Sequence, residues 1–469
     1  MDDKDALITE LRQTIEQLRL RVQELELALA RVQKDSSNSS KPPSGDLVKP
    51  PKPKAGGKRK PPKRGGQPGH KRHLREPLTP DRVNEWFTYE LCDEDVLERG
   101  LIPTDELETW QHIEFVESPI FVTEYRLRKY LTPQGETVLP VVPELDNLPL
   151  FGSRMLSMIG WLKSRAHCSY TTIEAWFTDV LNVPVSRGYL AKLCNGVISD
   201  SLANAYEELK QAIPRQEQLG SDETSLKNNG TTHWIWCITA KLFSLYHIAP
   251  TRSRSVLEEL IGEEFDGVLN CDYYSSNCSF TWNFPAKAQY CWAHLIRDIR
   301  FLLKHPQQKT KAWADELLDR TRRLFSAWHR RGEMTQAGFE HSMHHHRDRF
   351  LDLIEQTPDS KEANNLADRF GLVKLEEGRY YDLSHDYFRF AFESGVEPTN
   401  NHTEQQVRFC VIDRLITQGT RSDIGQRYHE RMWSAIATCA KQGRRFFDYL
   451  HQSLTAHLAA QPAPSLLPN

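Results

Sequence analysis

The sequence predicts a multidomain α+β protein, and three observations support that prediction. The chain has 469 residues with 39% hydrophobic content, enough to bury more than one core. Apolar residues repeat with a helical period near the amino terminus and again in residues 151–215. Alternating, strand-like runs begin at about residue 216. We therefore expect several folded domains joined by polar segments.

The composition argues against a membrane or secreted protein. No apolar run reaches the ~18–20 residues that a bilayer-spanning helix needs, and no signal peptide is evident. The nine cysteines are odd in number and form no Cys-x-x-Cys pair, and several lie in apolar runs where a reduced thiol packs as a small hydrophobe. We expect a cytoplasmic protein with no membrane partner.

Residues 1–33 are predicted to form a coiled-coil oligomerisation helix. Apolar side chains recur at alternating steps of three and four residues, with Glu, Arg and Gln between them, at Ile8, Leu11, Ile15, Leu18, Val22, Leu25, Leu29 and Val32. A single amphipathic helix docked on the body is the alternative. The narrow seam favours self-association, so we expect a homo-oligomer.

Residues 34–76 are predicted to form a disordered, basic, Pro/Gly-rich linker. Between Lys41 and Arg75 the chain carries twelve Lys or Arg against the single Asp46, and it has too few apolar groups to fold alone. Such a segment suits sequence-independent contact with DNA phosphates, although a merely solvated linker is the alternative. The residues expected to contact DNA are Lys58, Arg59, Lys60, Lys63 and Arg64.

Two smaller regions follow the linker. Residues 77–150 are expected to form a small β-containing module, because "QHIEFVESPIFVTEYRLRKYL" alternates as a strand does. Residues 151–215 are expected to be helical. There, "SYTTIEAWFTDVLNVPVSRGYLAKLC" predicts one helix, a break at residues 182–185, and a second helix capped by Ser186. This pattern fits a helix-turn-helix that reads DNA, but helical hairpins without that role are common.

From residue 216 the pattern changes to strands. The runs "QLGSDETS", "HWIWCITA" and "KLFSLYHIA" precede the helical "SRSVLEELIG", and "GVLNCDYYSS" follows. This order predicts a mixed sheet whose strand after the helix is parallel to the first strand, through a right-handed crossover. We expect Asp222 and Asp272, at the carboxyl ends of those two strands, to lie close together.

Two neighbouring aspartates repel each other, and burial makes their charged forms more costly unless a cation neutralises them. Carboxylate oxygens suit a hard ion such as Mg²⁺. With a third carboxylate, two ions ~3.5–4 Å apart can activate a water or a 3′-hydroxyl and stabilise the departing oxygen. This is the chemistry of DNA cleavage and joining.

The stretch "VEPTNNHTEQQVR" offers the third carboxylate. Glu404 stands three residues after Asn401, which satisfies a capping box, and Arg408 one turn later is an ordinary i,i+4 partner. Capping alone is therefore the local explanation. The predicted sheet needs a further helix that carries an acid, and this requirement favours Glu404 as a metal ligand that caps its helix only in part.

Seven motifs occur along the chain in a fixed order: "NSSKPPSGD", "GGQPGHKRH", "SDET", "CDYYSS", "CWAHLIRDIR", "NNHTEQQVR" and "GTRSDIGQRYHERMWSAIATCAKQGRRFFDYL". Together with the amino-terminal heptads, they resemble the insertion-sequence sixty-six (IS-66) transposases of bacteria, within the DDE superfamily. The resemblance covers nearly the whole chain.

The resemblance implies a ribonuclease-H-like catalytic domain over residues 216–460, with Asp222, Asp272 and Glu404 as catalytic metal ligands for two Mg²⁺ ions, or Mn²⁺ in their place. Glu404 follows Asp272 by 132 residues, which leaves room for a helical insertion at about 305–392. The implied activity is binding of inverted-repeat ends, cleavage that exposes 3′-hydroxyls, and joining to target DNA. Small accessory proteins of the same element are further partners, and the location is the nucleoid.

The resemblance also suggests supporting residues. Cys291 and His294 resemble a Cys-x-x-His signature of several transposase groups, and we expect structural support rather than a metal site, because two more ligands with zinc-like spacing are not evident. Asn400 and Asn401 are expected to line the site. Arg408 is expected to contact a DNA phosphate or to orient Glu404.

Two further features concern metals. Members of the resembled family usually carry a cysteine-rich zinc module between the basic linker and the helical region, but residues 77–150 hold only Cys92, and one thiol cannot hold a structural zinc. We therefore expect no zinc and a doubtful role for this module in end recognition. The cluster "HSMHHHRDR", with His341, His344, His345 and His346, is interpreted as a solvated helix face.

Two competing hypotheses remain. One is a non-catalytic DNA-binding protein derived from a transposase, against which the presence of all three acids speaks. The other is a coiled-coil scaffold with an unrelated metal hydrolase core, which would show no preference for inverted-repeat ends.

Overall fold

The computed structural model describes residues 2–32 and 78–88, scattered residues between 94 and 142, and residues 149–467 apart from 376, 377 and 379. The basic linker lies outside these ranges, and with it the predicted DNA contacts Lys58, Arg59, Lys60, Lys63 and Arg64, as does Cys92. The chain divides into two compact units, Pro51–Val141 and the remainder. Each is described by itself.

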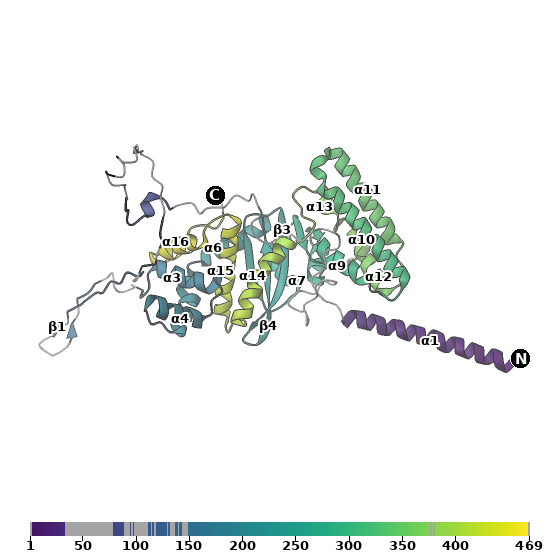
Figure 1. The fold of residues 1–469 in the computed structure, drawn as a ribbon, viewed down its shortest axis with the longest axis horizontal. Coiled ribbons are helices and arrows are strands. Elements are labelled where there is room, and N and C mark those ends of the chain that lie inside the picture. The colour runs from purple at the N-terminus through teal and green to yellow at the C-terminus, as the bar shows by residue number, and fades with distance from the viewer. Residues whose placement is uncertain are drawn as a thin grey trace. The chain divides into compact units, whose positions relative to one another are not determined.

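The predicted amino-terminal helix is confirmed as α1 (Asp2–Val32) (Figure 1). The described residues of its apolar seam are all exposed, from 47% for Ile8 to 60% for Leu18. Of the helices in the described part of the chain, none is long and apolar enough to cross a bilayer.

The strand predicted for residues 111–131 is wrong for most of the residues described there. The unit Pro51–Val141 contains a short 3-10 turn, η2 (Pro80–Arg82), and one two-residue antiparallel pair, β1 (Tyr130–Leu131) with β2 (Thr137–Val138). An alternating apolar and polar sequence forms a stable strand only where one face is buried and the backbone pairs with neighbouring strands. Phe121 in this run is 95% exposed.

The helical region predicted from residue 153 to about 213 is confirmed. Its elements are α3 (Ser153–Gly160), η4 (Trp161–Arg165), α4 (Tyr170–Leu181), α5 (Arg187–Leu193), η5 (Cys194–Ile198), α6 (Ala203–Ala212) and η6 (Ile213–Arg215). Ser169 and Ser186 cap α4 and α5 through hydrogen bonds from Thr172 N and Tyr189 N. Asn182 ends α4 in the left-handed conformation. The predicted break and the Ser186 cap are therefore both present.

A mixed five-stranded sheet follows, in the order β5-β4-β3-β6-β7. Its strands are β3 (Gln218–Asn228), β4 (Thr231–Thr239), β5 (Ser244–Ala249), β6 (Val268–Cys271) and β7 (Lys287–Tyr290). The first three are antiparallel, β6 is parallel to β3, and β7 is parallel to β6. The crossover from β5 to β6 runs through α7 (Arg254–Ile261), so the predicted parallel pair is confirmed.

One detail of that prediction is wrong. Asp222 does not end its strand, because β3 continues to Asn228 through its pairing with β4. Only the parallel pairing with β6 stops early, at Gly220. At Asp222, β3 is therefore still paired with β4 but no longer with β6.

One face of the sheet is covered by α14 (Asn401–Thr417) and α15 (Asp423–Lys441). The carboxyl-terminal helix α16 (Phe446–Leu458) packs against α15 and α3. The core on this face includes Leu226, Tyr246, Val407 and Trp433, all buried. It places α14 directly against β3 and β4.

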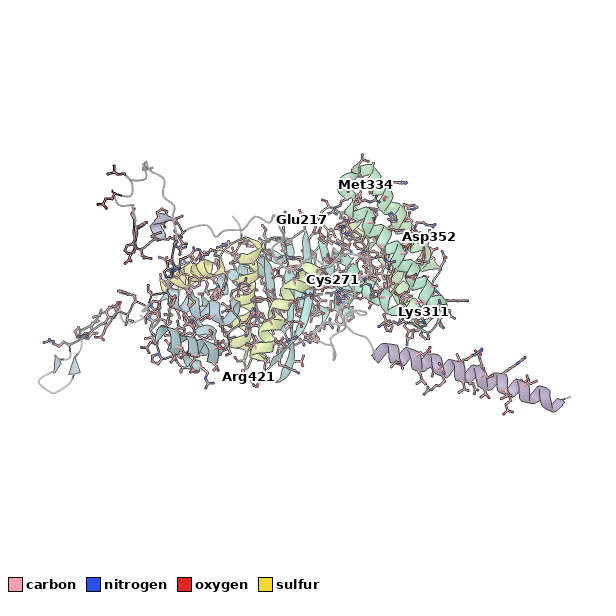
Figure 2. All side chains as sticks on the ribbon, viewed as in Figure 1. Glu217, Cys271, Lys311, Met334, Asp352 and Arg421 are labelled. Atoms are coloured by element: carbon pink, nitrogen blue, oxygen red, sulfur yellow. The ribbon has the colours of Figure 1, made fainter. Side chains whose placement is uncertain are left out.

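The segment between β6 and α14 contains most of the remaining helices. They are α8 (Ser275–Asn283), α9 (Trp292–Leu302), α10 (Gln308–His329), α11 (Gln336–Glu355), α12 (Lys361–Ala367) and α13 (Arg389–Phe392). Three 3-10 turns and the short pair β8 (Leu372–Lys374) and β9 (Tyr380–Asp382) complete it; the turns are η7 (Arg331–Glu333), η8 (Asp368–Phe370) and η9 (Leu383–His385). Figure 2 labels Lys311, Met334 and Asp352 on this mainly helical part and Cys271 at the end of β6.

A buried carboxylate joins the helical region to the sheet's covering helices. Asp413 on α14 is fully buried and accepts a hydrogen bond of 2.9 Å from Trp433 Nε1. His429 Nδ1 lies 3.3 Å from its second oxygen, and His167 Nδ1 lies 3.7 Å from its first. Burial opposes ionisation, but the two histidines and the charge of Lys163 outweigh it and hold the pKa of Asp413 below its usual range.

We predict that Asp413→Asn lowers the free energy of unfolding by about 3–5 kcal/mol near neutral pH, because it leaves the buried Lys163 ammonium without its carboxylate partner. A carboxyl whose folded-state pKa is depressed stabilises the fold above its unfolded pKa and loses that contribution as the pH falls. The gap between parent and variant in chemical denaturation should therefore narrow on acidification. Asp315→Asn, an exposed substitution on α10, is the control, expected to change stability by less than about 0.5 kcal/mol. A gap that widens in acid would contradict this assignment.

Candidate active site

The register of β3 and β6 places two aspartates at the same level. The parallel ladder pairs Gly220 with Asn270. Asp222 and Asp272 each stand two residues further along, just beyond the last paired position. The prediction that the carboxyl ends of parallel neighbours bring these two acids together is therefore consistent with the strand register.

The side chain of Asp222 faces α14. Side chains four apart in a strand share a face, so Asp222 lies on the face of Leu226, which packs with Val407 and Cys410 of α14. Glu404 lies in the first turn of the same helix. The third predicted acid is thus carried by the helix that covers Asp222.

Gly220 lets the first turn of α14 approach the sheet. A Cβ atom at this position would lie 2.2 Å from Thr403 Oγ1, 2.5 Å from Thr239 Oγ1 and 3.1 Å from Asn400 Oδ1. The hydroxyls of Thr239 and Thr403 are themselves 2.8 Å apart and buried. Only a residue without a side chain fits between β3 and α14 here.

Asn400 anchors α14 to β3 instead of capping it. It is the N-cap residue, it is buried, and its side chain makes no capping hydrogen bond. Its amide Nδ2 donates to the carbonyl of Ser221 at 2.7 Å. The predicted capping box with Asn401 as N-cap is wrong, because Asn401 is already the first helical residue and is exposed.

The chain that leads into α14 is tied to the neighbouring strands as well. Asn270 Nδ2 donates to Glu397 O at 2.7 Å, and Trp292 N donates to Pro398 O at 3.0 Å. The backbone N–H of Asn400 donates to Cys291 Sγ at 3.2 Å. The entry to α14 is therefore bonded to β3 and β6 and to the junction of β7 with α9.

Two cationic or polar side chains of α9 contact Glu404. His294 Nδ1 lies 3.5 Å and an Arg297 guanidinium nitrogen 3.7 Å from Glu404 Oε1. These residues are three apart and so share one helix face. Burial and the adjacent Arg297 lower the pKa of His294. Glu404 Oε1 is buried and has no hydrogen-bond partner among the described residues.

Asp272 is fixed by the helix that follows it. Asn277, buried on α8, donates from Nδ2 to Asp272 Oδ1 at 2.8 Å. Both oxygens of a carboxylate accept, so this bond orients the group and leaves acceptor capacity for a further partner.

The three acids influence one another electrostatically. Burial raises the pKa of Asp222 well above its usual value, and the charges of Glu223, Asp272 and Glu404 add to this effect. Such repulsion between carboxylates is what a bound divalent cation relieves. The arrangement is therefore chemically suited to one or more hard cations.

Glu223 is a fourth acid near the site that the sequence analysis did not single out. As the neighbour of Asp222 in the strand, it points to the opposite face. There its Oε1 accepts a 2.5 Å hydrogen bond from Arg252 Nε, and Arg252 stacks 3.3 Å from the ring centre of Tyr274. Burial and the charge of Asp272 raise the pKa of Glu223 to about 7 despite Arg252.

Cys291 and His294 form a compact group with Glu404. One ligand atom from each residue lies within 4.8 Å of the others, and no other such group of His, Cys, Asp or Glu occurs in the described part of the chain. Asp222 and Asp272 do not belong to it, so among the described residues the three predicted acids do not bring their oxygens within that distance of one another. Burial raises the pKa of the Cys291 thiol to about 11, so the thiol is protonated at neutral pH.

The other predicted residues lie on the surface. Arg408 is exposed one turn beyond Glu404, and the described ion pairs of Glu404 come from α9 instead. On α11, His341, His344 and His345 are exposed and His346 is half-buried. The roles assigned to these residues stay predictions.

Besides Glu223, three residues of the site were missed by sequence reasoning, and each of the three had some signal. Arg297 lies in "CWAHLIRDIR", three residues after His294, which is the spacing of one helix face. Asn277 lies just after "CDYYSS". Gly220 precedes Asp222 by two residues, and a glycine inside a strand often marks close approach of another backbone.

Comparison with family models matches residues 149–428 to the family described as Transposase IS66 family, a match that covers more than half of the chain and includes Asp222, Asp272 and Glu404. Residues 1–76 match a family of unknown function, DUF6444. A search of curated proteins found no match.

We predict that Gly220→Ala lowers the free energy of unfolding by about 1–3 kcal/mol, because the new methyl group forces α14 away from β3. Amide hydrogen exchange should quicken in the first turn of α14. Gly332→Ala is the matched control, because a Cβ there meets nothing within 4 Å. Equal stability and exchange in the two variants would contradict the close approach at Gly220.

Proposed function

Since the chain belongs to the IS66 family of transposases, we propose that it is a DDE transposase. It binds the inverted-repeat ends of an insertion sequence, cleaves the DNA to expose 3′-hydroxyls, and joins them to target DNA. The observation that supports this proposal most is the electrostatic influence of Asp272 and Glu404 on buried Asp222, together with the parallel register of β3 and β6.

We further propose that residues 216–460 form a ribonuclease-H-like catalytic domain. Three antiparallel strands followed by two parallel ones, in the order β5-β4-β3-β6-β7, are the sheet that this proposal requires. The proposed insertion at about 305–392 lies between α9 and α14 and is mainly helical. It separates Glu404 from the aspartates in sequence, and α14 returns Glu404 to the sheet.

The acids of the site fit Mg²⁺, with Mn²⁺ as a substitute. Mutual repulsion among the carboxylates favours a hard cation that takes oxygen ligands. Two ions held by Asp222, Asp272 and Glu404 would supply Lewis-acid stabilisation of the attacking and leaving oxygens of a phosphodiester.

The protein's own groups keep the carboxylates in position. Asn277 holds Asp272, while His294 and Arg297 hold Glu404. The Asn400 amide fixes the helix end that carries Glu404. These contacts determine which carboxylate oxygens of Asp272 and Glu404 would remain available to a bound cation.

DNA binding is proposed for three parts of the chain. The basic segment around residues 58–64 supplies sequence-independent phosphate contacts, and α4 with α5 forms a helix-turn-helix-like reader. Arg408, exposed one turn beyond Glu404, is positioned for a phosphate of the substrate. The DNA ends and the target are the expected partners, with accessory proteins of the same element.

The exposed seam of α1 supports self-association. Its apolar residues, including Leu11 and Leu18, are about half exposed, and a coiled coil would bury them. We therefore propose that α1 joins copies of this chain through that seam.

A non-catalytic DNA-binding protein derived from a transposase is the competing function. It predicts DNA binding without strand cleavage. A coiled-coil scaffold with an unrelated hydrolase core would instead bind the element's ends no better than other DNA, which a gel-shift titration measures.

We predict that Asp222→Asn lowers Mg²⁺-dependent cleavage of a plasmid that carries the element's ends by at least about a hundredfold. Loss of groups that only support metal ligands already costs 10- to 100-fold. Asp315→Asn, an exposed substitution of the same kind on α10, serves as the control and should cleave like the parent. Equal cleavage by Asp222→Asn and the parent would remove the catalytic proposal.

We also predict that Leu18→Asp reduces the oligomer to a smaller species, because it places a charge in the apolar seam. Sedimentation equilibrium measures the mass. Gln17→Asp introduces the same side chain outside the seam and should keep the parent's mass. An unchanged mass for Leu18→Asp would show that α1 does not hold the copies together.

A further inference from the structure

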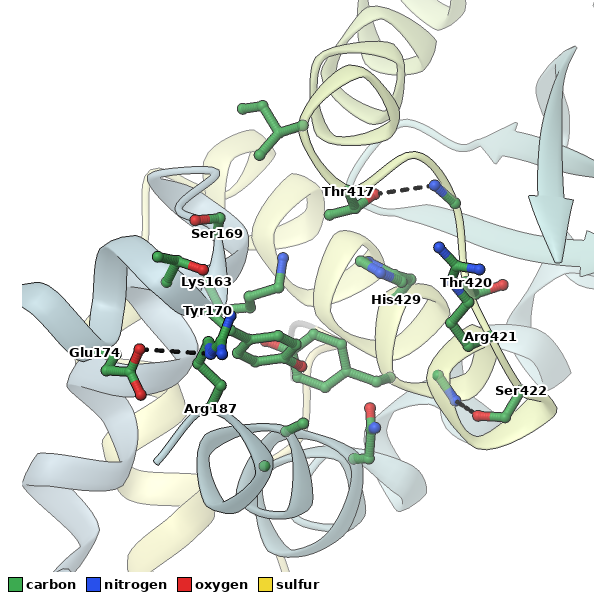
Figure 3. Close-up of a pocket in the computed structure, with 18 of the residues that line it drawn as sticks. Lys163, Ser169, Tyr170, Glu174, Arg187, Thr417, Thr420, Arg421, Ser422 and His429 are labelled. Carbon is green, nitrogen blue, oxygen red and sulfur yellow. Dashed lines mark hydrogen bonds and ion pairs between the residues drawn. The ribbon is translucent and has the colours of Figure 1, made fainter. Parts of the chain in front are cut away.

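A large cavity lies away from the three acids, between the helical region and the connection from α14 to α15. Its volume is about 790 Å³. One wall comes from α4 and α5, and the facing wall comes from the end of α14 and the start of α15 (Figure 3). The cavity therefore lies between the helix-turn-helix-like pair and the carboxyl-terminal part of the proposed catalytic domain.

The charge of the cavity is mainly positive. Lys163, Arg187 and Arg421 line it, and Glu174 is the single acidic residue among its lining residues. Glu174 lies 3.5 Å from Arg187 and offsets that charge in part. Arg187 and Arg421 are exposed, so the cavity mouth can admit a polymer that continues beyond it.

Lys163 is the buried cation of this cavity. Its side chain is buried, with the residue 3% exposed, yet Nζ has no hydrogen-bond partner among the described residues. Its charge is paired with Asp413 Oδ1 at 4.0 Å, a separation too long for a hydrogen bond, and Nζ lies 5.3 Å from the centre of the Tyr170 ring. Figure 3 shows this amino group directed into the space between Tyr170 and His429. An ammonium group has three donors, and buried donors are normally paired.

Three helices begin at this cavity. The N-cap residues of α4, α5 and α15 all line it, namely Ser169, Ser186 and Ser422. The first N–H groups of a helix lack partners inside the helix, and the helix dipole favours negative charge at that end. The lining is also rich in hydroxyl groups, from Ser169, Tyr170, Thr171, Ser186, Thr417, Thr420, Ser422 and Tyr428.

We propose that this cavity binds a backbone phosphate of DNA, with Lys163 as its buried cation and Arg187 and Arg421 at its mouth. This inference rests on the proposed function, and it adds a DNA contact outside the three acids. Lysine, arginine, hydroxyl side chains and helix N-termini are the groups that contact phosphates in protein–DNA complexes. Such a contact holds DNA in register without reading its sequence.

The test measures binding of the full chain to a fluorescein-labelled duplex of random sequence by anisotropy over a series of salt concentrations. Arg421→Gln and Arg187→Gln each remove one exposed cation. Each should weaken binding and reduce the slope of log K against log salt by about one. Lys163→Met should do the same where it folds. Arg322→Gln, an exposed arginine on α10, is the control and should keep the parent's slope.

Parent-like slopes for both Arg421→Gln and Arg187→Gln would overturn the inference, whatever Lys163→Met does. Calorimetry with inorganic phosphate separates a free anion from DNA. Phosphate binding that the variants lose, combined with unchanged DNA slopes, would overturn the assignment to DNA.

The outcome is separable from that of the proposed function. Cleavage by the parent with unchanged slopes would overturn this inference alone. Reduced slopes without any metal-dependent cleavage would support the phosphate contact while removing the catalytic proposal.

Discussion

The contact between the first turn of α14 and β3 at Gly220 is the constraint on which the site depends. Asp222 and Asp272 need only strand register to meet, because β3 and β6 are parallel and paired up to Gly220 and Asn270. Glu404 lies on a helix that the chain reaches only after a long, mainly helical segment. This helix lies close to Asp222 because Gly220 has no side chain to keep Thr403 away from β3. The side-chain amide of Asn400 also donates to a β3 carbonyl instead of capping its own helix.

The same contact concentrates negative charge, and the surrounding groups show how the fold tolerates it. Arg252 neutralises Glu223 on the far face of β3, while His294 and Arg297 approach Glu404 from α9. Among the described residues no cation pairs with Asp222, and burial with three neighbouring acids raises its pKa. Folding without a metal therefore leaves this carboxyl in an unfavourable environment. A divalent cation would supply the positive charge that the side chains around Asp222 do not.

Much of this could be predicted from the sequence where the signal was periodic or directional. The strand, hairpin, helix and strand order led to the parallel pair and to the placement of Asp222 and Asp272. The Ser186 cap and the break after Leu181 followed from turn chemistry. Failures came where a tertiary contact overrides a local pattern. Asn401 and Glu404 satisfy a capping box, yet Asn400 takes the N-cap position and bonds to Ser221. The alternation in residues 111–131 did not make a long strand, because alternation does not supply a pairing partner.

The most direct test of the three-acid centre is anomalous diffraction from crystals of the full chain grown with Mn²⁺ and a DNA duplex. The account predicts two Mn²⁺ peaks ~3.5–4 Å apart, with Asp222, Asp272 and Glu404 all among the ligands. Mn²⁺ bound at Cys291 and His294 without either aspartate, or no ion near Asp222 at saturating metal, would contradict it.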